Sequence, residues 1–178
     1  MIDHAPSSTV PGSSPVSSPR APAVSAAYRM DYRALILEGY AERRSGPRSS
    51  PRFFPGATEA ELARMAAALP FEPPADLLAL LRQTNGVLDT FEVSPGKTPS
   101  VVENLWLVWP VELLVAENEA AGELLRFAPA GVDGITYVLQ RHRQDVAAWC
   151  PLLRRELVPV ADSLESYSRR SAAGAIAL

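Results

Sequence analysis

The residue of this chain with the greatest potential for nucleophilic chemistry is its single cysteine, Cys150. A thiol becomes reactive when a nearby base or positive charge favours the thiolate, and the candidate base close to it in the sequence is His142. Cys150 ends an apolar stretch and precedes Pro151, a setting typical of a buried, unreactive thiol. We therefore expect no catalytic residues and no enzymatic activity. A small-molecule-binding or hydrolytic domain is the remote alternative.

Two further groups of residues could hold a cofactor or a metal ion. Gly131-Val-Asp-Gly134 has the glycines of a phosphate-binding loop, but we expect it to join two strands and not to open a helix. The carboxylates of Glu117, Glu119 and Glu123 have no histidine partners, which favours a solvated helix face. Two histidines and one cysteine in the whole chain exclude a zinc site of the usual kind. We expect no cofactor and no metal.

A basic stretch, formed by Arg43, Arg44, Arg48 and Arg52, could bind phosphate groups. The chain up to Arg52 carries seven basic and four acidic residues, whereas the remainder carries ten and sixteen. The formal net charge of −3 therefore combines a mildly basic N-terminal part with an acidic body. Because phosphate affinity grows with the number of charges neutralised, four arginines beside an acidic body favour a solvated linker. We expect no binding of nucleic acid.

The tryptophans and nearby acidic residues instead predict a protein-binding surface. In an extended segment, Trp106 and Trp109 point to opposite faces. Burial of both in the core is the interpretation that we favour, and the alternative is that one enters the core while the other anchors a partner. Asp89, Glu92 and Glu103 would attract a basic partner and speed its association if they shared a surface. The predicted partner-binding residues are therefore Trp106, Asp89, Glu92 and Glu103.

The N-terminal part of the chain differs in composition from the rest. Residues 1–27 consist mainly of Ser, Pro and Ala, which predicts a disordered arm. Tyr32, Leu35, Ile36 and Tyr40 recur at helical spacing, which predicts an amphipathic helix over Tyr28–Arg44 with a Pro/Arg linker after it. We divide the chain into a disordered arm, a helix with its linker, a folded domain and a C-terminal tail: 1–27, 28–52, 53–170 and 171–178.

The body contains helix signals followed by strand signals. Thr58-Glu-Ala-Glu61 is a capping box that begins a helix ending at Pro70, and Pro73-Pro74 opens a second helix that ends at Asn85-Gly86. Two further helices are expected over 110–121 and 162–170. Short alternating segments predict five strands: Val101–Trp109, Leu124–Ala128, Ile135–Gln140, Val146–Cys150 and Glu156–Val160. This order predicts an α+β fold with short helices packed on a mostly antiparallel sheet.

The hydropathy and the cysteine content of the chain predict its cellular location. The longest apolar run, Leu105–Val115, is interrupted by Pro110 and Glu112, so it falls short of the roughly 20 residues of a membrane helix. The first residues lack the basic start and apolar core of a signal peptide. A single cysteine cannot form an intrachain disulfide, which is typical of a reducing compartment. We therefore expect a cytoplasmic protein without membrane association.

The motifs of the body occur in a familiar order. They are Phe54-Pro-Gly-Ala-Thr58-Glu-Ala-Glu-Leu62, Pro74-Ala-Asp-Leu-Leu-Ala-Leu-Leu-Arg82 ending at Asn85-Gly86, Phe127-Ala-Pro-Ala-Gly131-Val-Asp-Gly134-Ile-Thr-Tyr137, Asp145-Val-Ala-Ala-Trp149, and Val160-Ala-Asp-Ser163-Leu-Glu-Ser-Tyr167. Together they resemble the SUKH superfamily, also called the Smi/Knr-type family. The resemblance covers roughly residues 53–170.

Bacterial members of this superfamily include immunity proteins of polymorphic toxin systems, and fungal members include a regulator of cell-wall synthesis. The resemblance therefore implies a noncatalytic protein-binding domain. The first functional hypothesis is that this chain is an immunity protein that binds and neutralises a cognate toxin. The expected partner is a basic, nuclease-like toxin domain. The alternative that it leaves open is a regulatory or scaffold module of the Smi/Knr type.

Overall fold

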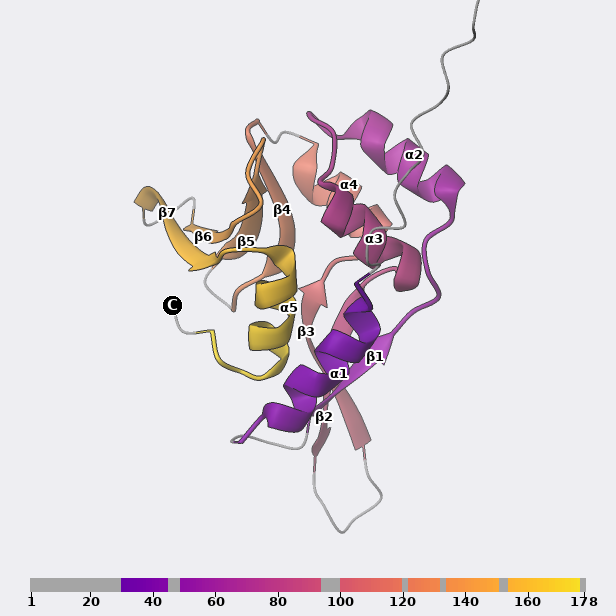
Figure 1. Cartoon of the computed structure of the whole chain (residues 1–178), viewed down its shortest axis with the longest axis vertical. Coiled ribbons are helices and arrows are strands. Elements are labelled where there is room, and N and C mark those ends of the chain that lie inside the picture. The colour runs from indigo at the N-terminus through magenta and orange to yellow at the C-terminus, as the bar shows by residue number, and fades with distance from the viewer. Residues whose placement is uncertain are drawn as a thin grey trace, which may run out of the picture.

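A computed structural model describes residues 30–44, 49–93, 100–119, 122–131, 134–150 and 154–176. Within these ranges the chain forms five helices and seven strands, and the strands lie in two antiparallel sheets (Figure 1). The α+β fold predicted from the sequence is confirmed, although the strands divide between two sheets where one was expected. The predicted disordered arm, 1–27, lies outside the described residues.

The N-terminal helix, α1 (Tyr32–Glu42), belongs to the folded body. Asp31 caps it, because its side chain accepts a hydrogen bond from the Ala34 amide at 3.0 Å. The buried face of α1 contains Tyr32 and Ile36, and Gly39 lies directly against the last helix, α5 (Leu164–Ala172). A Cβ at Gly39 would lie 2.5 Å from a backbone oxygen of α5. The two helices can therefore pack closely only with glycine at this position.

The predicted linker before the domain is partly wrong, since Ser49–Phe53 forms strand β1. β1 pairs antiparallel with β2 (Val87–Val93), which the sequence analysis also missed, and β2 pairs with β3 (Ser100–Val108). Pro51 is tolerated because β1 is an edge strand, where a missing amide donor costs no hydrogen bond on the open side. The Ser/Pro/Arg composition therefore concealed a strand that its pairing with β2 stabilises.

Three short helices lie between and after these strands. The capping box of α2 (Glu59–Ala68) is present: the Thr58 side chain accepts from the Glu61 amide while Glu61 accepts from the Thr58 amide. α3 (Ala75–Gln83) follows Pro74, and α4 (Val111–Asn118) follows Pro110. The buried Asn118 closes α4, because its amide group donates to the carbonyls of Leu114 and Arg126. The four helices predicted in the body are thereby confirmed, with shifted ends.

The second sheet contains β4 (Leu124–Pro129), β5 (Thr136–Gln140), β6 (Val146–Cys150) and β7 (Arg154–Ala161) in sequence order. It adjoins the first sheet where the Trp109 amide donates to the Phe127 carbonyl at 2.8 Å. The fully buried Tyr167 of α5 lies edge-on to Phe127 and Tyr137 and donates to the Leu107 carbonyl. α5 thus joins the two sheets in one core, and it extends two residues past the predicted domain end at 170.

In the described part of the chain, no helix has both the length and the apolar character needed to cross a membrane.

Candidate protein-binding surface

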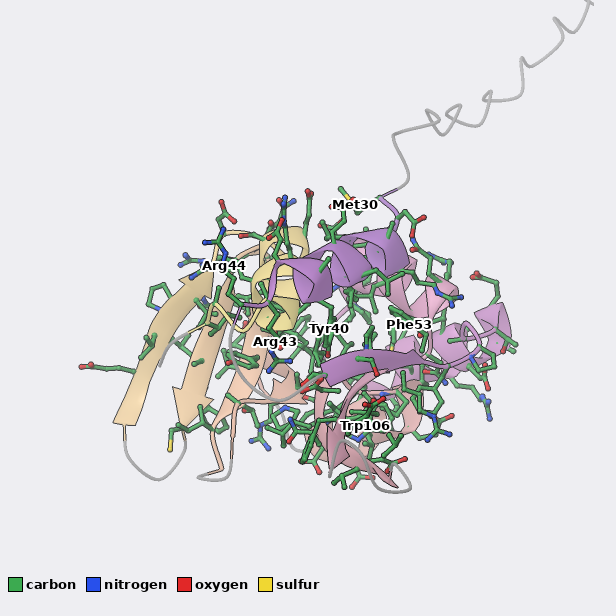
Figure 2. The ribbon with its side chains drawn as sticks, turned by 90° about the horizontal axis from the view of Figure 1, so that it is seen from below. Met30, Tyr40, Arg43, Arg44, Phe53 and Trp106 are labelled. Carbon is green, nitrogen blue, oxygen red and sulfur yellow. The ribbon has the colours of Figure 1, made fainter. Side chains whose placement is uncertain are left out.

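The three-stranded sheet has two faces with different surroundings. Figure 2 shows α1 on one side of β1, with Trp106 on the side away from α1. We call the α1 side the inner face and the opposite side the outer face. Residues that lie directly opposite each other on antiparallel strands have their side chains on the same face of the sheet. The pairs Ser50–Thr90 and Thr90–Glu103 therefore place these three residues on one face.

Asp89 lies on the inner face, where α1 covers it. Its carboxylate accepts hydrogen bonds from the Tyr40 hydroxyl at 2.6 Å and from the Asn104 amide at 2.9 Å, and Arg43 lies 3.7 Å away. Only 5% of Asp89 is exposed. Burial, together with this hydrogen bond, raises the pKa of the Tyr40 phenol well above its usual value of 10.0. The charge of Asp89 is therefore engaged inside the protein, and we leave Asp89 out of the candidate surface.

The outer face carries two aromatic rings in contact, tilted by 33° to one another, beside an ion pair. The ring centroids of Phe54 and Trp106 are 5.4 Å apart, and the Arg52 guanidinium lies 5.2 Å from the Phe54 centroid. Arg52 also donates to the Glu103 carboxylate at 2.8 Å. We call these four residues, Arg52, Phe54, Glu103 and Trp106, the outer platform. They come from β1, the residue after it and β3, so the pairing of the strands brings them together.

The position of Trp106 depends on Gly86. Gly86 has a φ of +90°, which favours glycine, and a Cβ there would lie 3.0 Å from the Trp106 ring and 2.9 Å from the Pro110 nitrogen. The Trp106 ring therefore lies close to Gly86, with part of its surface open to solvent. Trp109, by contrast, is 7% exposed and belongs to the main core. The alternative in which one tryptophan enters the core and the other stays partly accessible is the one observed.

The surroundings of the platform are apolar and acidic. Val101 and Leu105 on β3 are 64% and 37% exposed. Glu92 is exposed on β2, two residues beyond Thr90 and so on the same outer face. The side chains of Arg52 and Glu103 are 57% and 62% exposed. Such a surface offers flat rings for stacking, methyl groups for burial and charged groups for a partner's polar atoms.

Three of the four sequence-predicted residues, Trp106, Glu92 and Glu103, thus share the outer face of one sheet. The sequence analysis missed Arg52 and Phe54. Their alternation within Arg52-Phe53-Phe54 was the available signal, but it becomes informative only once this segment is known to be extended. The prolines and serines around it pointed to a linker instead.

The other candidate residues remain apart. His142 precedes β6 and Cys150 ends it, and the strand between Val146 and Cys150 spans about 13 Å. Glu123 forms an ion pair with Arg141, whose nitrogen lies 3.6 Å away. In the ranges that the structure describes, no three His, Cys, Asp or Glu residues gather as metal ligands would.

A hollow of about 500 Å³ lies between the connection from α2 to α3 and the turn after β5. Its walls bring the carboxylates of Glu72 and Asp76 opposite the guanidinium groups of Arg141 and Arg143. Arg143 is already bound to Asp145 at 2.7 Å. The hollow is lined by both negative and positive side chains and is open to solvent. It therefore indicates no particular class of ligand.

No protein-family model matches this chain, and no curated protein matches it. The resemblance to the SUKH superfamily is therefore carried by its motifs alone.

Proposed function

We propose that this protein is a noncatalytic protein-binding domain whose contact surface is the outer platform. One observation carries the proposal: a partly exposed Trp106 lies against the Phe54 ring and is bordered by the exposed Arg52–Glu103 pair. Trp and Arg are the residue types enriched among those that dominate binding energy at protein interfaces. A partner that covers the rings would exclude water from them and from the ion pair.

The side chains of the platform contact one another without any partner. Trp106 rests on Gly86, and Arg52 is held both by the Phe54 ring and by Glu103. Side chains that are already fixed lose less conformational entropy on association, so more of the contact energy is available for affinity. This arrangement supports a surface that binds as a preformed unit.

Within this class, we propose that the protein is a cytoplasmic immunity protein that neutralises a cognate toxin by binding it. The resemblance to the SUKH superfamily supports the role, and the acidic body supports a basic partner such as a nuclease-like toxin domain. Exposed Glu92 and Glu103 would contribute to the attraction of such a partner. Asp89 would not contribute, because its carboxylate is bonded on the inner face.

The test is co-expression with a toxin domain taken from a gene adjacent to that of this protein, with survival of the host and co-purification as readouts. Trp106→Ala should weaken the complex by roughly 30-fold, as expected for an interface residue whose truncation costs about 2 kcal/mol. Trp149→Ala is the matched control, because Trp149 is also partly exposed but lies under Arg126 on the other sheet.

Thermal unfolding of both variants separates folding from binding. A folded Trp106→Ala protein that still protects and still co-purifies at full strength would refute the outer platform as the contact surface. Removing residues 1–27 distinguishes the immunity role from the scaffold role: protection that survives the deletion supports immunity. Loss of partner binding on deletion would favour the regulatory or scaffold module.

A further inference from the structure

The two sheets have four edge strands, and three of these carry a proline. Pro51 lies in β1, Pro129 in β4 and Pro159 in β7. A proline has no amide donor, so it blunts an edge against pairing with another chain. On β7, Arg170 also covers a backbone acceptor, since it donates to the Val160 carbonyl at 2.6 Å. β3 (Ser100–Val108) is the exception among the described edge strands, because it contains no proline.

The free part of β3 is regular and apolar. Residues 100–103 pair with 90–93 without a register shift, whereas the shifts lie nearer the body. β3 meets the second sheet just past its end, at the hydrogen bond between Trp109 and Phe127. Three of the five large hydrophobic side chains that are exposed in the described chain lie on β3. Val101 and Val102 belong to the regular stretch, and Leu105 lies beside it at the register shift. An accessible, regular, apolar edge is a template for an added strand.

We propose that the partner adds a strand to the open edge of β3, and that this strand alternates apolar and basic residues. The proposal deepens the proposed function and rests on it, because the added strand would lie beside the outer platform. Backbone hydrogen bonds to β3 would supply much of the affinity, and alternate side chains would supply the selectivity, as in other strand-addition complexes.

Charge on the outer face selects basic residues for the strand. Thr90 pairs with Glu103, and Glu92 pairs with Val101, so Glu92 and Glu103 are diagonal neighbours on adjacent strands. Of the charged side chains on this part of the face, Arg52 is the cation that pairs with Glu103. This part of the face therefore carries two carboxylates and one guanidinium, and a Lys or Arg opposite Glu103 would balance the excess negative charge. An apolar residue one step away would cover Val102 on the inner side.

A second copy of this chain fits the edge poorly. Antiparallel self-pairing centred on Glu103 would oppose two glutamates directly, which is unfavourable. Centring the pair on Val102 would place each Glu103 opposite Val101 of the other copy, which supplies no positive charge to balance Glu92 and Glu103. The chain's own arm is equally unsuitable, because residues 1–27 contain five prolines that would interrupt the ladder of hydrogen bonds.

The test uses the full chain and three short fluorescent peptides. One alternates Val and Arg, the second alternates Val and Glu, and the third is the Val/Arg peptide with its backbone amides N-methylated along one edge. We expect saturable binding of the Val/Arg peptide, at least about tenfold weaker binding of the Val/Glu peptide, and loss of binding on N-methylation. Glu103→Lys should reverse the preference, whereas Glu156→Lys on β7 should preserve it.

Each alternative result overturns the strand-addition proposal. Binding that survives N-methylation would mean docking through side chains alone, and no binding of any peptide would mean that the edge does not accept this strand. Self-association of the free protein that Glu103→Gln strengthens would identify a second copy as the occupant, because the neutral side chain removes the repulsion between the two glutamates. None of these results affects the outer platform as a contact surface, which the Trp106→Ala experiment tests separately.

Discussion

The two faces of the three-stranded sheet use similar residues in opposite ways. On the inner face, α1 covers Asp89, and its carboxylate accepts from a tyrosine and an asparagine. On the outer face, Glu103 is 62% exposed and pairs with an equally accessible arginine. From the sequence, both acids were predicted to lie on the partner-binding surface. The two residues have different roles because their side chains lie on opposite faces of the sheet.

This difference indicates which interactions maintain the fold. A buried carboxylate that satisfies two donors leaves both donors unpaired when it is removed, which costs free energy of folding. An exposed ion pair contributes little to folding because water and salt screen it. We infer that the inner face is built for stability and that the outer platform can be changed with little loss of stability. The following variants test this contrast, in order of decreasing effect.

The largest effect is expected for Ile36→Ala on the inner face. Ile36 is fully buried with Val87, Leu107 and Ala172 between α1 and the sheet. Truncation leaves a cavity in this cluster, which costs roughly 2–5 kcal/mol in the free energy of unfolding. Leu37→Ala is the matched control on the same helix, because Leu37 is 52% exposed. Urea unfolding of both variants measures the difference, and equal losses would mean that α1 is not packed as described.

Gly39→Ala should have the next largest effect. The new Cβ would lie 2.5 Å from the Arg169 carbonyl oxygen and 2.7 Å from the Ala172 Cβ, so α1 and α5 must separate. Such overpacking costs about 1–3 kcal/mol, which outweighs the gain of up to about 1 kcal/mol in helix propensity. At Gly122 an added Cβ meets no atom within 4 Å, so Gly122→Ala should be nearly neutral. A stabilised Gly39→Ala protein would contradict the close helix contact.

A smaller effect is expected for Tyr40→Phe, which removes one donor from Asp89. The loss of this hydrogen bond should cost about 1 kcal/mol at neutral pH. Because burial and Asp89 raise the pKa of Tyr40 above 10.0, the folded protein keeps the phenol proton to higher pH than the unfolded chain. The stabilisation is therefore complete below pH 10 and is lost as the pH rises further.

Urea unfolding at several pH values on both sides of 10 tests this sign. The wild-type protein should lose stability above pH 10 more steeply than Tyr40→Phe, although both retain the raised pKa values of Tyr32 and Tyr167. Parallel curves for the two proteins would show that Tyr40 ionises equally easily in the folded and unfolded states.

The sequence predicted the elements whose signals are local. The capping box at Thr58 and the stop at Asn85-Gly86 lie within a few residues of the helices that they bound, and both helices are present. β1 was missed because its backbone is extended only through pairing with β2, a contact between segments about forty residues apart. The burial of Asp89 likewise depends on Tyr40 and Asn104, which no local pattern connects to it.

The residues of the candidate surface could likewise be predicted only in part. Alternation in an extended segment separated Trp106 from Trp109, and one of them is indeed core while the other is partly accessible. Which of the two remains accessible follows from Gly86 and the position of α4, which the sequence did not specify. Arg52 and Phe54 join the surface only because β1 is a strand. Long-range pairing, and not residue type, therefore decided the membership of the platform.

The smallest effect on folding is expected for Arg52→Ala, at the centre of the outer platform. Arg52 pairs with Glu103 and lies over the Phe54 ring, but 57% of its side chain is exposed, so its removal should cost at most about 1 kcal/mol. The effect on partner binding should be far larger, because a bound partner would exclude water from the same ion pair. Calorimetric titration of the partner into wild-type and Arg52→Ala protein, beside urea unfolding, measures both. A variant that unfolds as easily as Ile36→Ala would place Arg52 among the residues that maintain the fold, and the contrast between the two faces would then be lost.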